Sequence, residues 1–405
     1  MVPKTTNLLI IMQQQTEFTI NTSDTFATVK EYNTPRASYQ LLSGDGALRS
    51  VVIDPETKEI LCVAPPKSLT EEEFLKQQQG GQSYAPEAQD PPPLPEDLSE
   101  KGRGRRGTVG SLLNEIIEGT MVNLFYDKRI CQWEIATKGA IGGNYWYFRT
   151  SYGSNTMPQI TFRDMFLDAL MMPRDTELND VPLIASLDET MVYSFVMQHP
   201  MNHIVLPIEY PRLFLVAGYR VLADKTMVRS YPLWSLRERY FADTPLVSFP
   251  VEYQVQSYDD MPSAVGVMFH DIRTGYRLSK KNPEYERKRD IRGNHPNLQY
   301  QYLELNAENN VGLFLHEFPQ YTAMFNWFHY QTQNYISNLH SAYIAYFIQK
   351  RGKEIQIPKD IFIQIHNLHK NIYQGTKTRV NRKTIEEYVA GMTVSEQLFH
   401  INGGN

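Results

Sequence analysis

Short apolar runs that alternate with polar turns dominate the first three hundred residues. The runs 48–53 and 59–63 flank the polar turn Asp54–Lys58, and the runs 121–126 and 132–136 flank a turn at 127–129. Two β-branched runs around a short polar turn predict a β-hairpin. The same signal predicts further strands at 17–20, 193–197, 202–206, 213–217, 265–269 and 276–278.

Helical periodicity appears first at 161–172, where Phe162, Phe166 and Leu170 share one face and Pro173 follows. This spacing predicts an amphipathic helix that ends before the proline. After Gly293 the whole pattern becomes helical. The long stripe of Tyr, Phe and Leu within 321–351 predicts core packing rather than platforms for stacking bases. Helices are expected at 321–351, 360–373 and 384–392.

Between residues 77 and 110, Gln, Gly, Pro and charged residues replace the apolar ones. Such a segment cannot bury enough apolar surface to fold, so it predicts a disordered insertion. The expected fold class is therefore α+β, with antiparallel sheets and flanking helices. The predicted organisation is a body formed by 1–76 and 111–292, the insertion 77–110 within it, and an all-α C-terminal domain over 293–405.

Composition narrows the function classes. The 405 residues carry a net charge of −5, which excludes a uniformly basic nucleic-acid coat but not a local basic patch. Apolar residues make up 41% of the chain, which excludes global disorder. The only two cysteines, Cys62 and Cys131, exclude a disulfide framework and favour a reducing compartment. No apolar run is long enough for a signal peptide or a membrane helix, so we expect no membrane partner and a cytoplasmic protein.

Four segments carry a more specific pattern. The first contains Arg49 in an apolar strand and Lys67 after two prolines. The second contains Ile116-Ile-Glu118-Gly119 and, after the next hairpin, Thr137-Lys138-Gly139. The third is Tyr193 to Val205, with Phe195, Pro200 and Asn202. The fourth runs from Val265 to Phe269 and then through Ser279-Lys280-Lys281-Asn282-Pro283.

In this order the segments resemble the signature of the bacteriophage-type RNA ligases, within the covalent nucleotidyltransferase superfamily, and the RNA-ligase-like proteins of large DNA viruses. The resemblance spans about residues 48 to 292 and implies a nucleotidyltransferase-like body. In the family, a lysine of a Lys-x-Asp-Gly motif attacks the α-phosphate of a nucleotide. The resemblance implies contacts with nucleotide or phosphate at Arg49, Lys67, Glu118, Lys138 and Lys281.

The departures from the family pattern affect its chemistry. Aligning Glu118-Gly119 with Asp-Gly places Ile116 where the nucleophilic lysine should stand. A hydrocarbon side chain cannot form a phosphoamide, because that step needs an unprotonated amine. The glutamate of the third motif falls near Val196, and residues 261–270 contain no acid. We expect Ile116 to face a nucleotide-sized cleft if the alignment holds, and to pack in the core if it does not.

A basic segment follows the fourth motif. Residues 271–292 hold eight basic and four acidic residues, a local charge of +4. Such a patch suits an RNA backbone, although most charge runs are solvated helix faces. The residues 101–106 resemble a second, RG-type RNA-binding segment. We expect no metal at His199 and His203, because Pro200 bends the chain between them. The predicted nucleic-acid contacts are Arg277, Lys280, Arg287, Lys288, Arg289 and Arg292.

Three functions remain open. The first is a non-catalytic ligase-like protein that binds a nucleotide or RNA ends. The second is an active RNA ligase that uses ATP and Mg²⁺ to join 5′-phosphate and 3′-hydroxyl ends, with Lys138 or Lys67 as substitute nucleophile. The third is a structural or virion-associated viral protein with a protein partner on the insertion or the C-terminal helices.

Overall fold

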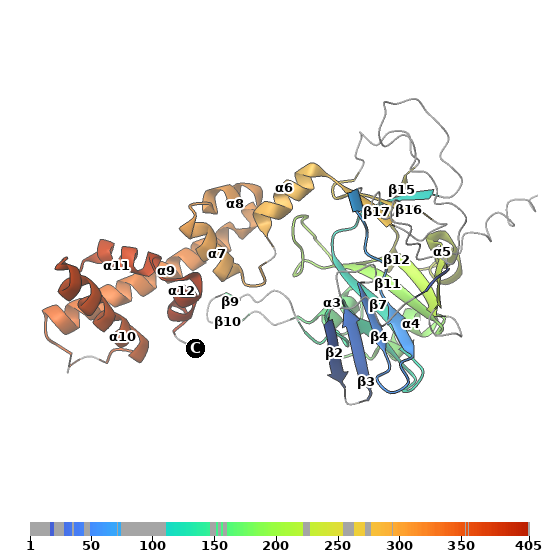
Figure 1. Cartoon of the computed structure of the whole chain (residues 1–405), viewed down its shortest axis with the longest axis horizontal. Helices are drawn as coiled ribbons and strands as arrows, with labels where there is room; N and C mark the ends of the chain where they lie inside the picture. The colour runs from blue at the N-terminus through green and yellow to red at the C-terminus, as the bar shows by residue number, and fades with distance from the viewer. Residues whose placement is uncertain are drawn as a thin grey trace, which may run out of the picture. The chain divides into compact units, whose positions relative to one another are not determined.

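The computed structural model describes most of the chain (Figure 1). The predicted insertion 77–110 and its basic segment 101–106 lie outside the described residues. The described ranges are 17–19, 28–34, 36–43, 49–70, 72–73, 111–145, 151–152, 155–156, 160–221, 227–253, 263–271, 277–293, 295–352, 354 and 356–403.

The chain forms two compact units. The first comprises residues 1–146 and 160–289, and the second comprises 147–159 and 290–405. Strands occupy most of the first unit and helices the second, so the predicted α+β class with a helical C-terminal region is confirmed. Among the described helices, none is both long and apolar enough to cross a lipid bilayer.

The largest sheet of the first unit, here called the central sheet, carries the hairpin predicted at 121–136. Its neighbouring strands run antiparallel, except that β14 lies parallel to β12. In spatial order the strands are β1 (Glu17–Thr19), β13 (Met227–Tyr231), β12 (Arg212–Val221), β11 (Met191–Gln198), β7 (Thr120–Asp127) and β8 (Gln132–Ala136), with β14 (Val247–Ser248) beside β12.

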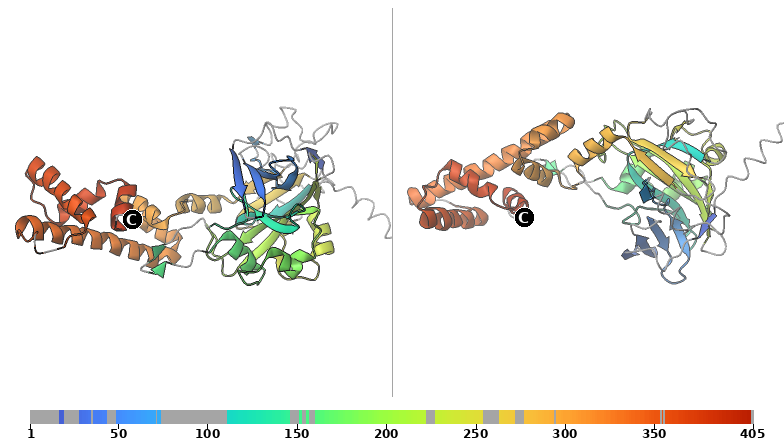
Figure 2. Two further views of the ribbon diagram at one scale, coloured as in Figure 1. Left: turned by 90° about the horizontal axis from the view of Figure 1, so that it is seen from below. Right: turned by 45° about the horizontal axis from the view of Figure 1, so that its top comes forward.

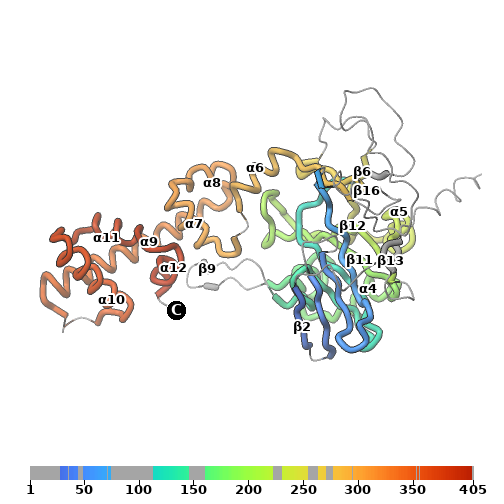
Figure 3. Tube along the Cα trace, viewed as in Figure 1, coloured from blue at the N-terminus to red at the C-terminus, as the bar shows by residue number. Residues whose placement is uncertain are grey.

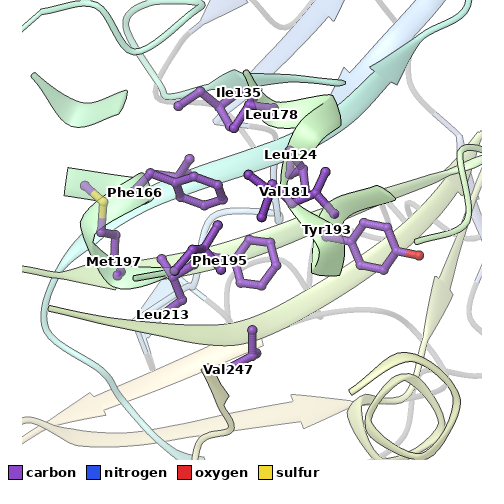
Figure 4. Packing of buried hydrophobic residues seen from close by; sticks show 14 of the residues in the cluster. Leu124, Ile135, Phe166, Leu178, Val181, Tyr193, Phe195, Met197, Leu213 and Val247 are labelled. Atoms are coloured by element: carbon purple, nitrogen blue, oxygen red, sulfur yellow. The ribbon is translucent and has the colours of Figure 1, made fainter. Parts of the chain in front are cut away.

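Successive residues of the central strands point to opposite faces, and each face has its own core. Leu124 of β7 joins a cluster with Phe195 of β11 and Phe166 of the helix α3 (Phe162–Ala169), shown in Figure 4. Phe125, the next residue, packs instead against a second sheet. The helical side also contains η2 (Leu178–Asp180), α4 (Pro182–Ala185) and α5 (Leu233–Tyr240).

The second sheet, here called the outer sheet, contains the hairpin predicted at 48–63. Its antiparallel strands bury Tyr39, Leu41 and Val51 against Phe125 and Tyr219 of the central sheet. The strands are β2 (Thr28–Asn33), β3 (Ser38–Ser43), β4 (Ser50–Ile53) and β5 (Ile60–Val63). A third sheet is ordered β15 (Glu252–Tyr253), β6 (Ser111–Glu115), β16 (Gly266–Asp271) and β17 (Arg277–Lys281). A small hairpin pairs β9 (Ser151–Tyr152) with β10 (Asn155–Thr156).

Helices of the second unit pack around the long helix α9 (Thr322–Tyr343), as the views in Figure 2 show. Two aromatic and aliphatic clusters form its core, one around Phe314 and Phe325 and the other around Leu339 and Ile365. The other elements from α6 onward are α6 (Pro283–Arg292), α7 (Leu298–Ala307), α8 (Val311–Glu317), η3 (Pro319–Tyr321), η4 (Ile344–Ile348), α10 (Lys359–Leu368), η5 (His369–Gln374), α11 (Arg382–Ala390) and α12 (Val394–Ile401).

Two predictions from the pattern were wrong. The strand expected at 202–206 is a loop that follows a turn closed by the Asn202 N–H and the His199 carbonyl. The α-helix expected to run to residue 351 ends at Tyr343, and the chain then forms the π-helical turn η4 up to Ile348. Apolar runs of five residues fit a strand and a buried loop equally well, and only tertiary contacts separate the two.

An arginine between two buried carboxylates joins the outer sheet to the central sheet. Arg129 lies 2.7 Å from Asp127 at the end of β7 and 3.1 Å from Asp54 after β4. Its guanidinium also stacks over the ring of Tyr39 in β3. Burial alone would raise the pKa of both carboxyl groups. Hydrogen bonds and the charge of Arg129 outweigh this effect and hold both pKa values below normal.

We expect Arg129→Met to lower the free energy of unfolding by about 3 kcal/mol, because two buried carboxylates lose their counter-charge. A group with a lowered folded pKa stabilises above its ordinary pKa, near 3.9, and loses that contribution as pH falls through the folded value. Without Arg129 the folded pKa values rise, so the loss should begin at a higher pH. Urea titrations between pH 3 and pH 7 would measure both effects.

The matched control is Lys128→Met, which removes the preceding, exposed charge. It should change the free energy of unfolding by less than about 0.5 kcal/mol. Equal stability of the two variants at pH 7 would contradict the role given to Arg129.

Candidate functional site

The four segments singled out in the sequence meet at one place in the first unit. β6 leads into residues 116–119 and then into β7, and the Ile116 N–H donates to the Gly266 carbonyl of β16. The stretch that contains Lys67 runs along β17, with Leu69 and Leu278 bridged in parallel. Figure 3 traces these strands through the first unit. Sheet pairing therefore brings together residues separated by more than two hundred positions.

Glu118 is the centre of this junction. One carboxylate oxygen accepts hydrogen bonds from the N–H groups of Ile204 and Val205, at 2.8 and 2.9 Å. The Leu206 N–H donates to the same carboxylate, 3.2 Å from its second oxygen. The side chain is buried, and the hydroxyl of Tyr285 from α6 is a further neighbour. Burial and the Glu118 charge raise the pKa of Tyr285.

These contacts change the role expected for Glu118. The sequence suggested a residue that orients a ribose or a metal-bound water, or an exposed strand-end glutamate. In the structure both oxygens are occupied by backbone donors, so the carboxylate holds the loop 204–206 in place. A carboxylate that accepts several backbone N–H bonds is a strong structural link.

Gly119 is required by its close approach to β11. A Cβ atom at this position would lie 2.4 Å from the carbonyl oxygen of Met197. The adjacent Glu118 carbonyl accepts a hydrogen bond from the side chain of Gln198, at 2.9 Å. The glycine that resembles the family motif thus has a packing reason of its own, because no larger residue fits there.

Ile116 has apolar surroundings. Its side chain is partly buried and packs against the cluster of Val205, Val265 and Tyr285. This contact agrees with the second expectation, that Ile116 packs with apolar side chains, and a hydrocarbon side chain offers no amine to a phosphorus atom. The alignment of Ile116 with the nucleophile therefore has no support from its surroundings.

The predicted phosphate-binding lysines lie in different settings. Lys67 pairs with Glu73 at 3.1 Å, and Lys281 pairs with Glu286 at 3.5 Å. Lys138 is exposed on the turn closed by the Thr137 N–H and the Ala140 carbonyl. The two ion pairs place a carboxylate beside the amines of Lys67 and Lys281.

The predicted nucleic-acid surface over 277–292 is only partly available. Arg287 and Lys288 share Glu284 as an ion-pair partner, while Lys280 and Arg289 are exposed. Arg292 is buried, so its assignment to an RNA contact is wrong. Its guanidinium donates to Gln301, at 2.8 Å, and stacks over the ring of Tyr321, so it stabilises the second unit instead.

The positive charge of Arg277 has few hydrogen-bond and ion-pair partners among the described residues. The side chain is largely enclosed, and its Nε has no hydrogen-bond partner among the described residues. One terminal nitrogen donates to the Pro66 carbonyl at 3.2 Å. Burial lowers the pKa of Arg277, Tyr219 of the central sheet opposes that shift, and Arg49 at the start of β4 adds to it. A second positive charge, that of Arg49, thus acts on the Arg277 guanidinium.

His270 lies opposite Arg277 in the β16–β17 register and adds no negative charge. Burial, followed by the charge of Arg277, lowers the pKa of His270 to about 3. Burial also raises the pKa of Tyr219 to about 12, so its hydroxyl is neutral at pH 7. An uncompensated buried cation is costly, and an anion bound there would remove the cost. The sequence named Arg277 only as one charge of a surface patch, because its burial depends on two other sheets.

The histidines near the third segment are occupied by protein groups. His199 accepts from the Met201 N–H, and its other ring nitrogen lies 3.3 Å from Asp168. Within the described part of the chain, no three His, Cys, Asp or Glu side chains lie together in a way that could hold a metal ion.

The role given to Glu118 predicts a loss of stability rather than of ligand affinity. Glu118→Gln should lower the free energy of unfolding by about 2 kcal/mol, because an amide NH₂ replaces one of two acceptor oxygens that face backbone donors. Glu209→Gln, an exposed change in the same loop region, is the matched control. Urea unfolding of both variants measures the difference, and equal midpoints would contradict the structural role.

Comparison with known proteins gives weak likenesses only. No family model matches the chain, and no curated protein matches it. A protein described as an ATP-dependent DNA ligase from Aquifex aeolicus is 10% identical, with 85% of this chain and 78% of that chain covered and a TM-score of 0.36. An RNA ligase of Naegleria gruberi, solved with ATP and Mn, is 9% identical, with 69% and 98% covered and a TM-score of 0.30. The same ligase, solved with pyrophosphate, is 8% identical, with 69% of this chain and 99% of that chain covered and a TM-score of 0.30. TM-scores this low do not establish a shared fold, so the chain is similar to these ligases and is not assigned to their family.

Proposed function

We propose that this chain is a ligase-like protein of nucleotidyltransferase type that binds a nucleotide or a 5′-phosphorylated RNA end without forming a covalent adduct. The observation that carries the proposal is the guanidinium of Arg277, whose buried Nε has no hydrogen-bond partner among the described residues and which the charge of Arg49 repels. A phosphate would supply the missing negative charge and accept from that nitrogen. Charge-assisted bonds of this kind are among the strongest that arginine makes.

The lack of covalent chemistry follows from three positions. Ile116 carries no amine and packs against apolar side chains. Glu118 has no free oxygen to offer a ribose or a metal. The amines of Lys67 and Lys281 are each engaged in an ion pair with a glutamate. No step of adenylate transfer can be built on these residues.

An active ligase would need Mg²⁺ and ATP, and the residues of this site suit only one of the two. Carboxylate oxygens that could hold Mg²⁺ do not gather in the described part of the chain, and the acid of the family pattern is already satisfied. The residues therefore do not fit the metal. They do fit the phosphate groups of ATP, because Arg277 offers a buried, unpartnered donor and the positive charge of Arg49 acts on the same position.

The absence of covalent chemistry can be tested with the full chain, α-labelled ATP and Mg²⁺. After denaturing electrophoresis we expect no label on the chain. Ile116→Lys should also stay unlabelled, because the new amine would enter the Val205 and Tyr285 cluster without an acid beside it. Label on the unaltered chain would favour an active ligase with a substitute nucleophile and would overturn the proposal.

Binding at Arg277 can be tested with ATP and with RNA that ends in 5′-phosphate or 5′-hydroxyl. Arg277→Gln should weaken binding of ATP and of the 5′-phosphate RNA about tenfold or more, since a charged hydrogen bond contributes about 1.5–3 kcal/mol. It should leave the free protein equally or more stable to urea, because an unpaired buried charge is removed.

Arg212→Gln is the matched control. Arg212 also has a buried, unpartnered Nε, but it stacks over the rings of Tyr210 and Phe214. It should leave nucleotide affinity unchanged. Equal affinity of the unaltered chain for the two RNA ends, together with no ATP binding, would refute a phosphate site at Arg277.

A further inference from the structure

The strongest separation of charge along the chain lies in the second unit, outside the segments that resemble ligases. Residues 343–383 contain nine lysines and arginines and two acidic residues, a net charge of +7 in a chain whose total is −5. The segment covers the end of α9, η4, α10, η5 and the start of α11. Charge of one sign concentrated on one part of a surface attracts a polyanion.

Most of these cations are not paired within the protein. Lys350, Lys359, Lys370, Lys377 and Arg379 are exposed, and none has a carboxylate within ion-pair distance among the described residues. Arg351, Arg382 and Lys383, by contrast, pair with glutamates three or four residues away. A solvated helix face that served stability alone would be expected to alternate charges at such spacings.

Aromatic rings of the same segment form one connected series. The ring of Phe347 in η4 stacks on that of His369 in η5, with centroids 4.0 Å apart and planes 3° from parallel. The ring of Tyr373 also stacks on that of His369, with centroids 5.0 Å apart. On α10, Phe362 contacts His366, which in turn contacts Phe347.

The outer members of this series are open to solvent. Phe362 is 38% exposed and Tyr373 is 49% exposed, and Ile348 beside them is 65% exposed. The core packing predicted for the aromatic stripe of the long helix is thus confirmed for Phe328, Leu339 and Tyr343, and it continues at Phe347, which is half-buried against the same cluster. Exposed rings in contact with one another are uncommon on a surface without a partner.

Two π-helical turns place these rings. η4 and η5 occupy the ends of two packed helices, α9 and α10, whose hairpin is seen in Figures 1 and 2. A π-helical turn is rare and is found mostly at functional sites. Here each π turn contributes one ring of the Phe347–His369 stack, and the Tyr343 hydroxyl fixes the His369 ring through a hydrogen bond at 3.1 Å.

We propose that this surface, formed by 344–350 and 359–379, binds single-stranded RNA. Unpaired bases would stack on the exposed faces of Tyr373 and Phe362, and phosphates would contact the unpaired lysines. The choice of RNA over DNA rests on the proposed function, whereas the binding of a single strand rests on the rings and charges. A duplex fits poorly, because its bases already stack on one another.

The ring contribution can be measured with the full chain and a labelled twelve-nucleotide RNA that ends in 5′-hydroxyl, by fluorescence anisotropy. The double variant Phe362→Ala with Tyr373→Ala should weaken binding roughly tenfold or more, with an unchanged salt dependence. Tyr330→Ala, which removes a 58% exposed ring of α9, should have no effect. Equal losses in the two variants would overturn the stacking role.

The charge contribution is read from the salt dependence. Five phosphate contacts predict a slope of about −3.5 for log affinity against log salt concentration. Lys359→Gln with Lys370→Gln should reduce the slope by about 1.4, whereas Lys30→Gln with Lys128→Gln, two exposed lysines of the first unit, should leave it unchanged. A slope that falls equally in both pairs would refute a localised site.

Three competitors decide the class of partner. Duplex RNA, single-stranded DNA of the same sequence and polyglutamate should all bind more weakly than the single-stranded RNA, and equal binding of any of them would overturn the assignment. Arg277→Gln should not alter affinity for the 5′-hydroxyl RNA. The failure of this inference is therefore separable from a failure of the phosphate site at Arg277.

Discussion

The carboxylate of Glu118 links the central sheet, the loop 204–206 and the start of α6 through one set of hydrogen bonds. Three backbone N–H groups donate to it, and Tyr285 adds its hydroxyl. Three segments, separated by up to 167 positions, meet around this single buried charge. The interaction that organises the junction thus also occupies both oxygens of this carboxylate with protein donors.

Two arginines of the first unit, Arg129 and Arg277, differ in how far the protein compensates their charge. Arg129 is satisfied, with two buried carboxylates and an aromatic ring around it. Arg277 is left with one carbonyl and a neighbouring arginine. Proteins keep an uncompensated buried charge where a ligand completes it, and stability is lost in the free state as a consequence. This contrast distinguishes a structural ion pair at Arg129 from Arg277, the position at which we propose that a phosphate binds.

The net charge of a segment does not by itself identify a binding surface. Residues 271–292 carry a net charge of +4, yet Arg292 is buried and two of the other cations share Glu284 as an ion-pair partner. The larger excess over 343–383 lies among rings that a helical stripe assigns to a core. Two π turns at the ends of α9 and α10 expose those rings beside unpaired lysines. Burial and pairing, rather than local composition, decide which charges remain available.

The sequence by itself determined the fold class, both hairpins at 48–63 and 121–136, and the helical C-terminal region, because strand and helix periodicities and turn residues are local signals. It also established that position 116 carries no nucleophile. Only the tertiary structure decided that 202–206 is a loop held by Glu118, that Ile116 packs against apolar side chains, and that Arg277 is enclosed while Tyr373 is open. Burial and hydrogen-bond partners arise from strands and helices that are distant in the chain, and no local pattern encodes which of them will meet.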